Sequence, residues 1–331
     1  MIFHRSTEME ALMQRVNKGL GAVFGTSRVV HTITGSGTAT MELAVRGGSR
    51  RKVLSIVHGD FGERFAKMAE SCGRKVERLK SSLGDVVPLD RIRESLRAGD
   101  YDAVTCTYSE TATGVLADVA SIASIVREKS DCLFLVDAVS AAGAVEIRAD
   151  AWPADAVVSA SQKALALPPG LGFAAVSDRF VERARTLDDR GTYLDVIRFE
   201  EFAEKHQSPT TPAVSLLYAL DAQMAAIEKE TVAARFARHA AMMRTCTAWV
   251  ERVGGKISLV AKQSVRSPSV TCIGIADNRP LLNAMRSRGY ELGGGQAELA
   301  KSSFRIGHMG DHTVQGVNAM LEVLENTLRS L

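Results

Sequence analysis

The sequences F-L-V-D-A-V-S-A-A-G at residues 134–143 and A-D-A-V-V-S-A-S-Q-K-A-L-A-L-P-P-G-L-G-F at residues 154–173 decide how this chain folds. The first contains most of an apolar run, Leu133–Val136, of the kind that a fully buried parallel strand shows. The run ends at Asp137, and a carboxylate in such a place is costly unless a cation or hydrogen bonds meet it. The sequence therefore predicts a buried strand whose polar end needs a partner.

The second sequence adds a lysine at a similar place. Its apolar run, Ala156–Val158, leads to Lys163, which follows Asp137 by 26 residues and precedes a turn rich in proline and glycine. This pair suits a pyridoxal phosphate pocket, where the aspartate pairs with the protonated ring nitrogen and the lysine holds the cofactor aldehyde as a Schiff base. The alternative is a core aspartate paired with another cation and a surface lysine in a loop.

Strands and helices alternate along the first part of the chain. The expected strands are 29–34, 53–57, 76–79 and 103–107, and the expected helices are 8–24, 38–45, 61–71, 89–96 and 122–128. Such alternation predicts an α/β fold with a mostly parallel sheet and helices on both faces. Sheets of this kind place ligands at the carboxyl ends of their strands.

The second part of the chain has a different pattern. Residues 212–253 form a long, alanine-rich helical stretch with at most one break. The elements expected after it are a strand at 270–275, a helix at 280–288, a strand at 304–306 and a closing helix from 314. We therefore expect a large domain at residues 1–230 and a smaller α/β domain at residues 231–331.

The composition excludes several classes of protein. The chain has 331 residues, of which 46% are hydrophobic and 24% charged, and its net charge is +3, as in ordinary globular enzymes. No basic cluster interleaves with aromatic residues, so we expect no nucleic acid partner. No apolar run is long enough to span a membrane, and the first residues lack the apolar core of a signal peptide. We expect a cytoplasmic protein with no membrane partner.

Cysteines and histidines give no metal site. The five cysteines form no C-x-x-C pair and are predicted to be reduced, mostly buried thiols. His308 and His312 are four residues apart, but Gly310 lies between them and no carboxylate completes an H-E-x-x-H pattern. We therefore expect no metal.

A glycine-rich turn precedes the second expected helix. Gly35-Ser36-Gly37-Thr38 would place unpaired backbone N–H groups and the positive end of the helix dipole toward a phosphate. An ordinary capped helix start is the alternative, and the Asp137–Lys163 pair downstream favours the phosphate.

Six motifs in this order resemble those of a known family. They are T-G-S-G-T-A-T-M-E at 34–42, H-G-D-F-G-E-R at 58–64, S-E-T-A-T-G-V-L at 109–116, V-D-A-V-S at 136–140, S-A-S-Q-K at 159–163 and F-R-I-G-H-M-G at 304–310. Together they resemble the class V aminotransferases of fold-type I, the branch with alanine–glyoxylate, serine–pyruvate and 2-aminoethylphosphonate–pyruvate transaminases. The resemblance implies a pyridoxal 5'-phosphate enzyme that moves an amino group from a small amino acid or aminophosphonate to a 2-oxo acid such as glyoxylate or pyruvate.

The resemblance also implies roles for residues around the cofactor. Gly37, Thr38 and Gln162 would bind its phosphate. Phe61 would stack on one face of its ring, as flat apolar side chains do, and Val139 would cover the other face.

Four more residues complete the implied site. Thr111 would bond the phenolic oxygen, although a loop threonine more often bonds its own backbone. Asp137 would keep the ring nitrogen protonated, while Lys163 holds the cofactor and acts as the base. Arg305 would hold the substrate carboxylate with its planar fork.

The resemblance further implies a homodimer with shared sites. Ser208-Pro209-Thr210-Thr211-Pro212 is similar to a family turn whose threonine reaches the partner's cofactor phosphate, so Thr210 is the candidate. A simple helix cap is the alternative for this segment.

Two other activities stay open. A class V lyase or desulfurase would share the fold, but desulfurases carry His before the lysine, where this chain has Gln162, and a mobile Cys before the position of Arg305. The other is a specialised relative with an altered substrate site. In this family a Gly-Pro-Thr-Pro-type segment that lines the substrate pocket usually precedes the sequence H-R-S, which here is His4–Ser6.

Overall fold

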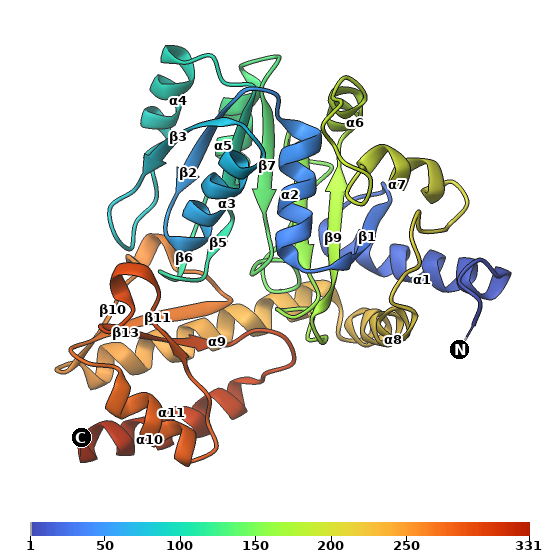
Figure 1. The fold of residues 1–331 in the computed structure, drawn as a ribbon. Helices are drawn as coiled ribbons and strands as arrows, with labels where there is room; N and C mark the ends of the chain where they lie inside the picture. Colours follow the sequence, from blue (N-terminus) through green and yellow to red (C-terminus); the bar gives the residue numbers. More distant parts are fainter. Residues whose placement is uncertain (1) are drawn as a thin grey trace.

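A large sheet forms the centre of the molecule in a computed structural model that describes residues 2–331 (Figure 1). Its seven strands have the order β1-β9-β8-β7-β4-β2-β3, which places β7 in the middle. The strands are β1 (Val30–Gly35), β2 (Lys52–Val57), β3 (Lys75–Lys80), β4 (Ala103–Thr107), β7 (Leu133–Asp137), β8 (Ala156–Ala160) and β9 (Gly170–Val176).

Most of the sheet is parallel. The strands β3, β2, β4, β7 and β8 pair in parallel, whereas β9 pairs antiparallel with both β8 and β1. Parallel strands need crossover connections and are usually covered on both faces. Because Asp137 of β7 lies opposite Val158 of β8, Asp137 and the segment after β8 emerge at the same edge of the sheet.

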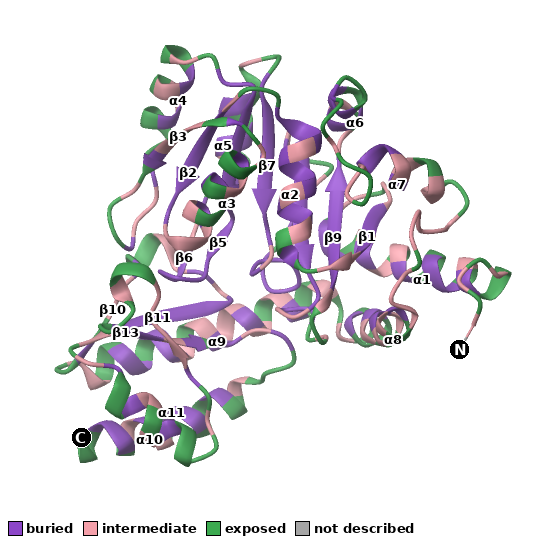
Figure 2. Ribbon diagram, in the orientation of Figure 1, coloured by how far each residue is buried: buried purple, intermediate pink, exposed green. Residues whose placement is uncertain are grey.

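Helices cover both faces of this sheet, and each layer has its own apolar core. One core joins the sheet to α1 (Thr7–Phe24), α4 (Leu89–Ala98), α5 (Val119–Arg127) and α8 (Val214–Glu230). The other joins it to α2 (Gly37–Gly48), α3 (Asp60–Ser71), α6 (Asp178–Arg185) and α7 (Val196–Ala203). Figure 2 shows the central strands buried and the outer faces of the helices exposed. The predicted α/β class with a mostly parallel sheet is therefore confirmed.

A second, antiparallel sheet faces the first. Its order is β10-β11-β13-β12, from β10 (Ile257–Leu259), β11 (Val270–Ile275), β12 (Gly293–Gly294) and β13 (Ser303–Gly307). It shares a core with α9 (Val232–Val253), α10 (Arg279–Ser287) and α11 (Val314–Ser330). The expected break in the long helical stretch lies at Thr231, where φ is 69° and the side chain caps α9. A domain boundary between residues 230 and 231 stays a prediction.

Two strand features were not anticipated, one in the large sheet and one in a separate two-stranded sheet. The segment expected to be only a Pro/Gly-rich turn contains β9, and residues 109–116 contain a small hairpin of β5 (Ser109–Glu110) and β6 (Val115–Leu116). Glycine weakens the strand signal of β9, since glycine is depleted in strands. At Gly172 it is required by packing, because a Cβ there would lie 2.4 Å from Cγ2 of Thr40 on α2.

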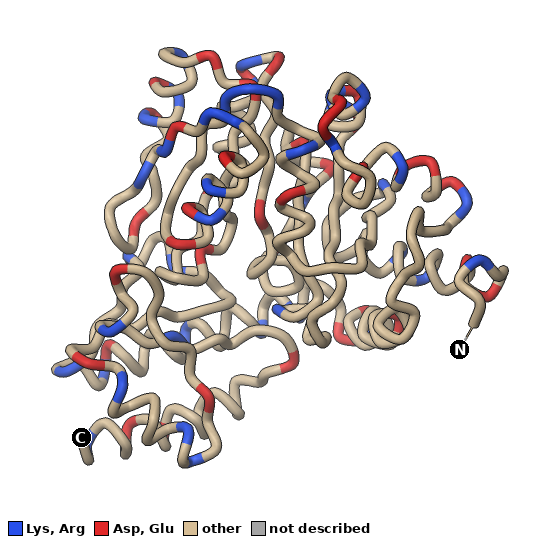
Figure 3. The backbone as a smooth tube through the Cα atoms, viewed as in Figure 1, with Lys and Arg blue, Asp and Glu red and all other residues tan. Residues whose placement is uncertain are grey.

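Charged residues lie mainly on the helices and loops, with both signs interspersed (Figure 3). Within residues 2–331, no helix is both long and apolar enough to cross a membrane. The same residues contain no group of three or more His, Cys, Asp or Glu side chains that could hold a metal ion.

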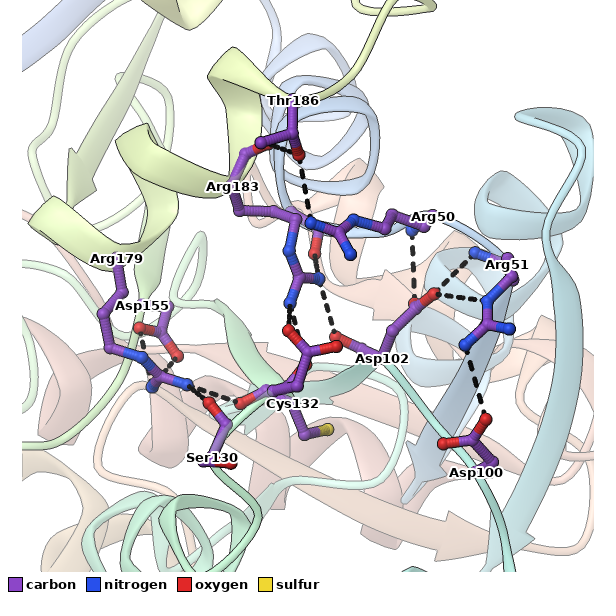
Figure 4. Close-up of polar contacts among 12 residues, drawn as sticks. Arg50, Arg51, Asp100, Asp102, Ser130, Cys132, Asp155, Arg179, Arg183 and Thr186 are labelled. Carbon is purple, nitrogen blue, oxygen red and sulfur yellow. Dashed lines mark hydrogen bonds and ion pairs between the residues drawn. The ribbon is translucent and has the colours of Figure 1, made fainter.

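A network of charged residues lies at the amino-terminal edge of the parallel strands, and Asp102, Asp155 and Arg183 within it are buried (Figure 4). The Asp102 carboxylate, 3% exposed, accepts the backbone N–H groups of Arg50 at 3.2 Å and Arg51 at 2.7 Å. From α6, Arg183 donates to the carbonyl of Asp102 at 3.3 Å, and Arg179 donates to Asp155 at 3.2 Å. The ionic groups of this edge are therefore partnered by the protein itself, which anchors α6 and the strand starts.

Candidate active site

The carboxyl-terminal edge of the large sheet faces the small sheet (Figure 1), and most of the predicted site residues belong to segments that meet at this edge. Asp137 is the last residue of β7, and Lys163 lies in the turn that follows β8. Thr111 lies in the turn of the β5–β6 hairpin, and Arg305 lies on β13 of the small sheet. The fold thus brings together side chains that are far apart in the sequence.

The carboxylate of Asp137 is buried without a cation. The residue is 2% exposed, and its Oδ1 accepts the Val139 N–H at 2.8 Å while its Oδ2 accepts the Thr107 hydroxyl at 3.4 Å. No Lys, Arg or His of residues 2–331 forms an ion pair with it. Burial raises the pKa of Asp137 to about 6, although both hydrogen bonds oppose that shift. A cationic group placed beside this carboxylate would stabilise its charged form.

Lys163 belongs to the turn after β8, at the same edge of the sheet as Asp137. Its Nζ is 5.9 Å from the centroid of the Phe61 ring. Burial lowers the pKa of Lys163, as do the charges of Arg305 and Arg64, whereas Asp137 opposes the change. A lysine with a lowered pKa is a better base and nucleophile at neutral pH than a free lysine.

The start of α2 forms a narrow cradle beside these groups. Ser36 is its N-cap but makes no side-chain cap hydrogen bond, so the first N–H groups of the helix are open to an anion. A Cβ at Gly37 would lie 2.8 Å from Cγ2 of Val139, so only glycine allows α2 to approach the end of β7 this closely. Thr38 is exposed in the first turn of the helix.

The ring of Phe61 is held by the start of α3. The backbone N–H groups of Phe61 and Gly62 donate to the two oxygens of Glu110, at 3.2 and 3.0 Å. The N–H of Ala112 donates to the same carboxylate at 3.0 Å. Glu110 is fully buried, and the motif S-E-T-A-T-G was used only for Thr111, so this anchor was missed. Arg64, also missed, lies with its guanidinium carbon 4.9 Å from the centroid of the Phe61 ring.

Thr111 and Arg305 lie next to each other across the gap between the two sheets. The Thr111 hydroxyl is 2.7 Å from that of Ser140, and its carbonyl accepts from Nη1 of Arg305 at 3.4 Å. Nε of Arg305 donates to the carbonyl of Gly294 at 2.8 Å. These contacts orient the guanidinium without neutralising it.

Two carboxylates close to Arg305 in the sequence, Asp311 and Glu298, do not pair with it. Asp311 binds Arg235 instead, at 2.9 Å, and Glu298 forms no ion pair within residues 2–331. Burial lowers the pKa of Arg305, opposed by Cys272 and by the carboxylates of Glu110 and Asp60. Arg305 is therefore a half-buried cation whose fork can accept a carboxylate.

A cluster on α9 ties the turn of Lys163 to the segment after β13. Arg235, 2% exposed, donates to the carbonyl of Ala164 at 2.7 Å and to Asp311 at 2.9 Å. Nε2 of His239 accepts the N–H of Gly310 at 3.1 Å. A Cβ at Gly310, where φ is +80°, would lie 3.1 Å from Cβ of Ala166. The backbone beside the lysine is thus fixed by residues that carry no legible motif.

Thr210 lies outside this group, in the segment between α7 and α8. Helix α8 begins at Val214, and its N-cap Ala213 makes no side-chain cap hydrogen bond, so Thr210 is not the helix cap. The N–H of Ala213 donates to the Thr34 hydroxyl at 3.0 Å, which holds this segment beside the strand that leads into the cradle.

The arrangement fits the groups of pyridoxal phosphate. Asp137 offers a buried anion for a protonated ring nitrogen, Lys163 offers an amine for an aldehyde, and the start of α2 offers N–H groups for a phosphate. Gln162 has a buried amide oxygen without a hydrogen-bond partner. This atom marks a place for a hydrogen-bond donor of a ligand or, if the oxygen and nitrogen of the amide are exchanged, for a hydrogen-bond acceptor of a ligand. The fit rests on the buried Asp137 and the Gly37 cradle more than on any motif.

A mostly parallel sheet with a strand-end aspartate, a lysine after the next strand and a second small sheet defines a protein of fold-type I. The family model of the class V aminotransferases matches residues 1–291. The chain therefore belongs to the class V aminotransferases, and it is an enzyme that transfers an amino group from an amino acid to a 2-oxo acid.

Relatives of similar length support this assignment. The chain is 36% identical to an uncharacterized aminotransferase of Methanocaldococcus jannaschii, over 100% of this chain and 88% of that one. It is 32% identical to a protein of Synechococcus sp. named as the small subunit of a soluble hydrogenase, over 100% and 88%. Its fold is similar to the crystal structure of an alanine–glyoxylate aminotransferase from Nostoc sp., with a TM-score of 0.93 at 28% identity, covering 99% of this chain and 89% of the other.

The buried Glu110 predicts a specific pH dependence of stability. Burial raises the pKa of Glu110 from 4.5 to about 7, so the folded protein binds this proton more tightly than the unfolded chain. The contribution of Glu110 to the free energy of unfolding therefore falls as pH rises through that window, by up to about 3 kcal/mol at about 1.4 kcal/mol per pKa unit. Gln has no such proton, so Glu110→Gln should gain stability relative to wild type between about pH 5 and about pH 7.

Urea unfolding at several pH values measures this difference. Glu322→Gln, at an exposed position on α11, is the matched control and should follow wild type. If the free energy of unfolding of Glu110→Gln changes with pH in the same way as that of wild type between about pH 5 and about pH 7, Glu110 does not hold its proton as the structure indicates.

Proposed function

We propose that this chain is a pyridoxal 5'-phosphate-dependent transaminase whose cofactor site is the edge formed by β7, β8 and the start of α2. The observation that carries the proposal is the buried carboxylate of Asp137, which has no cation of its own yet shares an edge with Lys163. A buried charge without a partner is rarely retained in a protein unless a ligand completes it. A protonated pyridine nitrogen is a partner of the right charge.

The cofactor, when bound, supplies an electron-accepting ring that stabilises the charge left on the substrate Cα. Asp137 would hold the pyridine nitrogen in its protonated form, because the buried carboxylate has no other cation to pair with. Lys163 provides the amine that the substrate amine displaces. The same amine would serve as the base that takes the proton from the substrate Cα, a role that its lowered pKa suits.

The remaining residues position these groups. Phe61, fixed through Glu110, would cover one face of the ring, and Val139, fixed by its bond to Asp137, would cover the other. The hydroxyl of Thr111 would bond the phenolic oxygen. Gly37, Thr38 and Gln162 would hold the phosphate at the start of α2.

We infer that Arg305 holds the substrate carboxylate. Arg305 forms no ion pair within residues 2–331, and its fork is oriented by the carbonyls of Gly294 and of Thr111, which lies in the turn between β5 and β6. Both the amino donor and the 2-oxo acceptor present a carboxylate, so one arginine serves both half-reactions. Alanine as donor and glyoxylate as acceptor agree with the likeness to the Nostoc enzyme. Serine or an aminophosphonate as donor and pyruvate as acceptor belong to the same proposal, since each is a small substrate of the same kind.

We also infer a homodimer that shares its sites through Thr210. Thr210 does not cap α8, and its segment is held at Thr34, directly before the cradle at Gly35–Gly37. A second copy that docks against this surface could therefore receive Thr210 at its own phosphate.

The attachment of the cofactor is tested by labelling. Protein loaded with pyridoxal phosphate should absorb visible light, and borohydride should fix the label on the peptide that contains Lys163. Lys163→Ala should lose both the absorbance and the label, whereas Lys301→Ala, at an exposed position, should keep them. A label on another lysine, or protein that stays colourless with added cofactor, would contradict the proposal.

The role of Arg305 is tested with Arg305→Lys. Lysine keeps the charge but cannot reproduce the planar fork, so both half-reactions should weaken by about 1.5–3 kcal/mol, roughly 10- to 150-fold in kcat/KM. The visible spectrum and the unfolding midpoint should stay as in wild type. Arg279→Lys, on exposed α10, is the control. Unchanged kinetics with donor and acceptor would show that the substrate anchor lies elsewhere.

The shared site is tested by mixing two inactive variants, Lys163→Ala and Thr210→Trp. A mixed dimer combines the intact Lys163 of one chain with the intact Thr210 of the other. Random mixing should then restore about a quarter of the wild-type sites, as expected for a two-fold dimer. Mixed dimers that form without activity, or a monomer that is fully active, would rule out the shared site.

A further inference from the structure

Two buried hydroxyl groups meet at the carboxyl-terminal edge of the large sheet, and only one of them has a role in the proposed function. The hydroxyl of Thr111, in the turn between β5 and β6, lies 2.7 Å from that of Ser140, in the segment after β7. Both residues are 5% exposed, and within residues 2–331 neither hydroxyl makes another hydrogen bond. The side chain of Ser140 therefore has Thr111 as its one polar partner in this part of the chain.

The hydroxyl pair joins the two walls between which the cofactor ring is placed. Ser140 directly follows Val139, and Thr111 directly follows Glu110. The carboxylate of Glu110 accepts the backbone N–H of Phe61 at 3.2 Å. Phe61 and Val139 would cover opposite faces of the ring, so a contact between the segments that support them closes one edge of the slot. A polar group at this edge is placed for an oxygen substituent of the ring.

The hydrogen atoms of the pair leave one donor unused. Each hydroxyl has one O–H and two acceptor lone pairs. The 2.7 Å contact uses one of the two O–H groups, so the other has no acceptor within residues 2–331. A buried pair of Ser55 and Thr105, 2.8 Å apart in the middle of β2 and β4, also has one unused donor. The Ser140–Thr111 pair differs in its position, because it lies among the residues of the proposed cofactor site.

We propose that Ser140 is a positioning residue that orients the Thr111 hydroxyl toward the phenolic oxygen of the cofactor, an inference that rests on the proposed function. A phenolic oxygen that carries negative charge only accepts hydrogen bonds, so the Thr111 O–H has to donate to it. Thr111 then accepts from the Ser140 O–H, and both donors of the pair are used. Hydrogen bonds in such a chain strengthen one another, by about 10–30% per bond.

This arrangement predicts a measurable property of the loaded protein. A donor at the phenolic oxygen draws away negative charge, which weakens the hold of that oxygen and of the Lys163 nitrogen on the proton they share. Ser140 strengthens this donor, so it lowers the pH at which the visible absorbance changes. The other charged groups that act on this edge keep their side chains in the variants below; they are Asp60, Arg64, Glu110, Asp137 and Arg305.

A spectrophotometric pH titration of the full-length, cofactor-loaded protein tests the inference without any amino donor or oxo acid. Thr111→Val removes the hydroxyl and should raise the pH midpoint of the visible absorbance by about one unit, the tenfold change expected for a lost bond to a charged group. Ser140→Ala should raise the midpoint by about 0.3 to 0.5, or about two- to threefold, because only the support of that bond is lost.

A double variant shows whether Ser140 acts through Thr111. The Ser140 hydroxyl has nothing to orient once Thr111 has lost its own, so the double variant should titrate like Thr111→Val alone. Ser55→Ala is the matched control, since it removes one hydroxyl of the other buried pair. It should lower the urea midpoint of unfolding as Ser140→Ala does, while the titration of its visible absorbance stays that of wild type.

The opposite outcomes overturn the inference. If Ser140→Ala titrates like wild type, or if the two shifts add in the double variant, Ser140 does not act through Thr111. A larger shift in Ser140→Ala than in Thr111→Val would place Ser140 itself on the phenolic oxygen. Wild-type protein that takes up no pyridoxal phosphate would overturn the proposed function, and this inference with it, so the two failures are distinguishable.

Discussion

The carboxylate of Asp137 is the constraint on which the rest of this structure depends. It lies at the end of the central strand, 2% exposed, with two hydrogen bonds and no cation within residues 2–331. The large buried sheet and the two helical layers offset the free-energy cost of burying this carboxylate. Lys163, in the turn after β8, and Arg64, on α3, bring positive charge near the carboxylate without forming an ion pair with it. That imbalance is what a cationic cofactor ring would complete.

The two edges of the large sheet differ in whether the protein itself provides partners for the buried carboxylates. At the amino-terminal edge, Asp102 and Asp155 are met by backbone N–H groups or by arginines of α6, so little is left for a ligand (Figure 4). At the carboxyl-terminal edge, the Asp137 carboxylate has no ion pair within residues 2–331, and the Gln162 amide oxygen has no hydrogen-bond partner there. Stability therefore resides at one edge and binding capacity at the other, as expected for parallel α/β sheets.

Sequence patterns predicted the fold class and most of the site, because those signals are local. Asp137 and Lys163 each follow a short apolar run, and the glycines of the cradle precede a helix. Glu110 and Arg235 could not be predicted in their roles, since each acts through contacts between segments distant in the sequence. Strand β9 was missed for a related reason: Gly172 is required by its contact with α2, a packing constraint that reads locally as a turn.

The central claim is that Asp137 sustains transamination by keeping the cofactor nitrogen protonated. Its most direct test is the single-turnover half-reaction of Asp137→Asn with L-alanine, followed by the change in the visible spectrum. The account predicts that the variant still carries cofactor on Lys163 but reacts at least about a hundredfold more slowly, the scale of a lost electrostatic contact in a catalytic site. A rate equal to wild type would contradict the account and assign Asp137 a purely structural role.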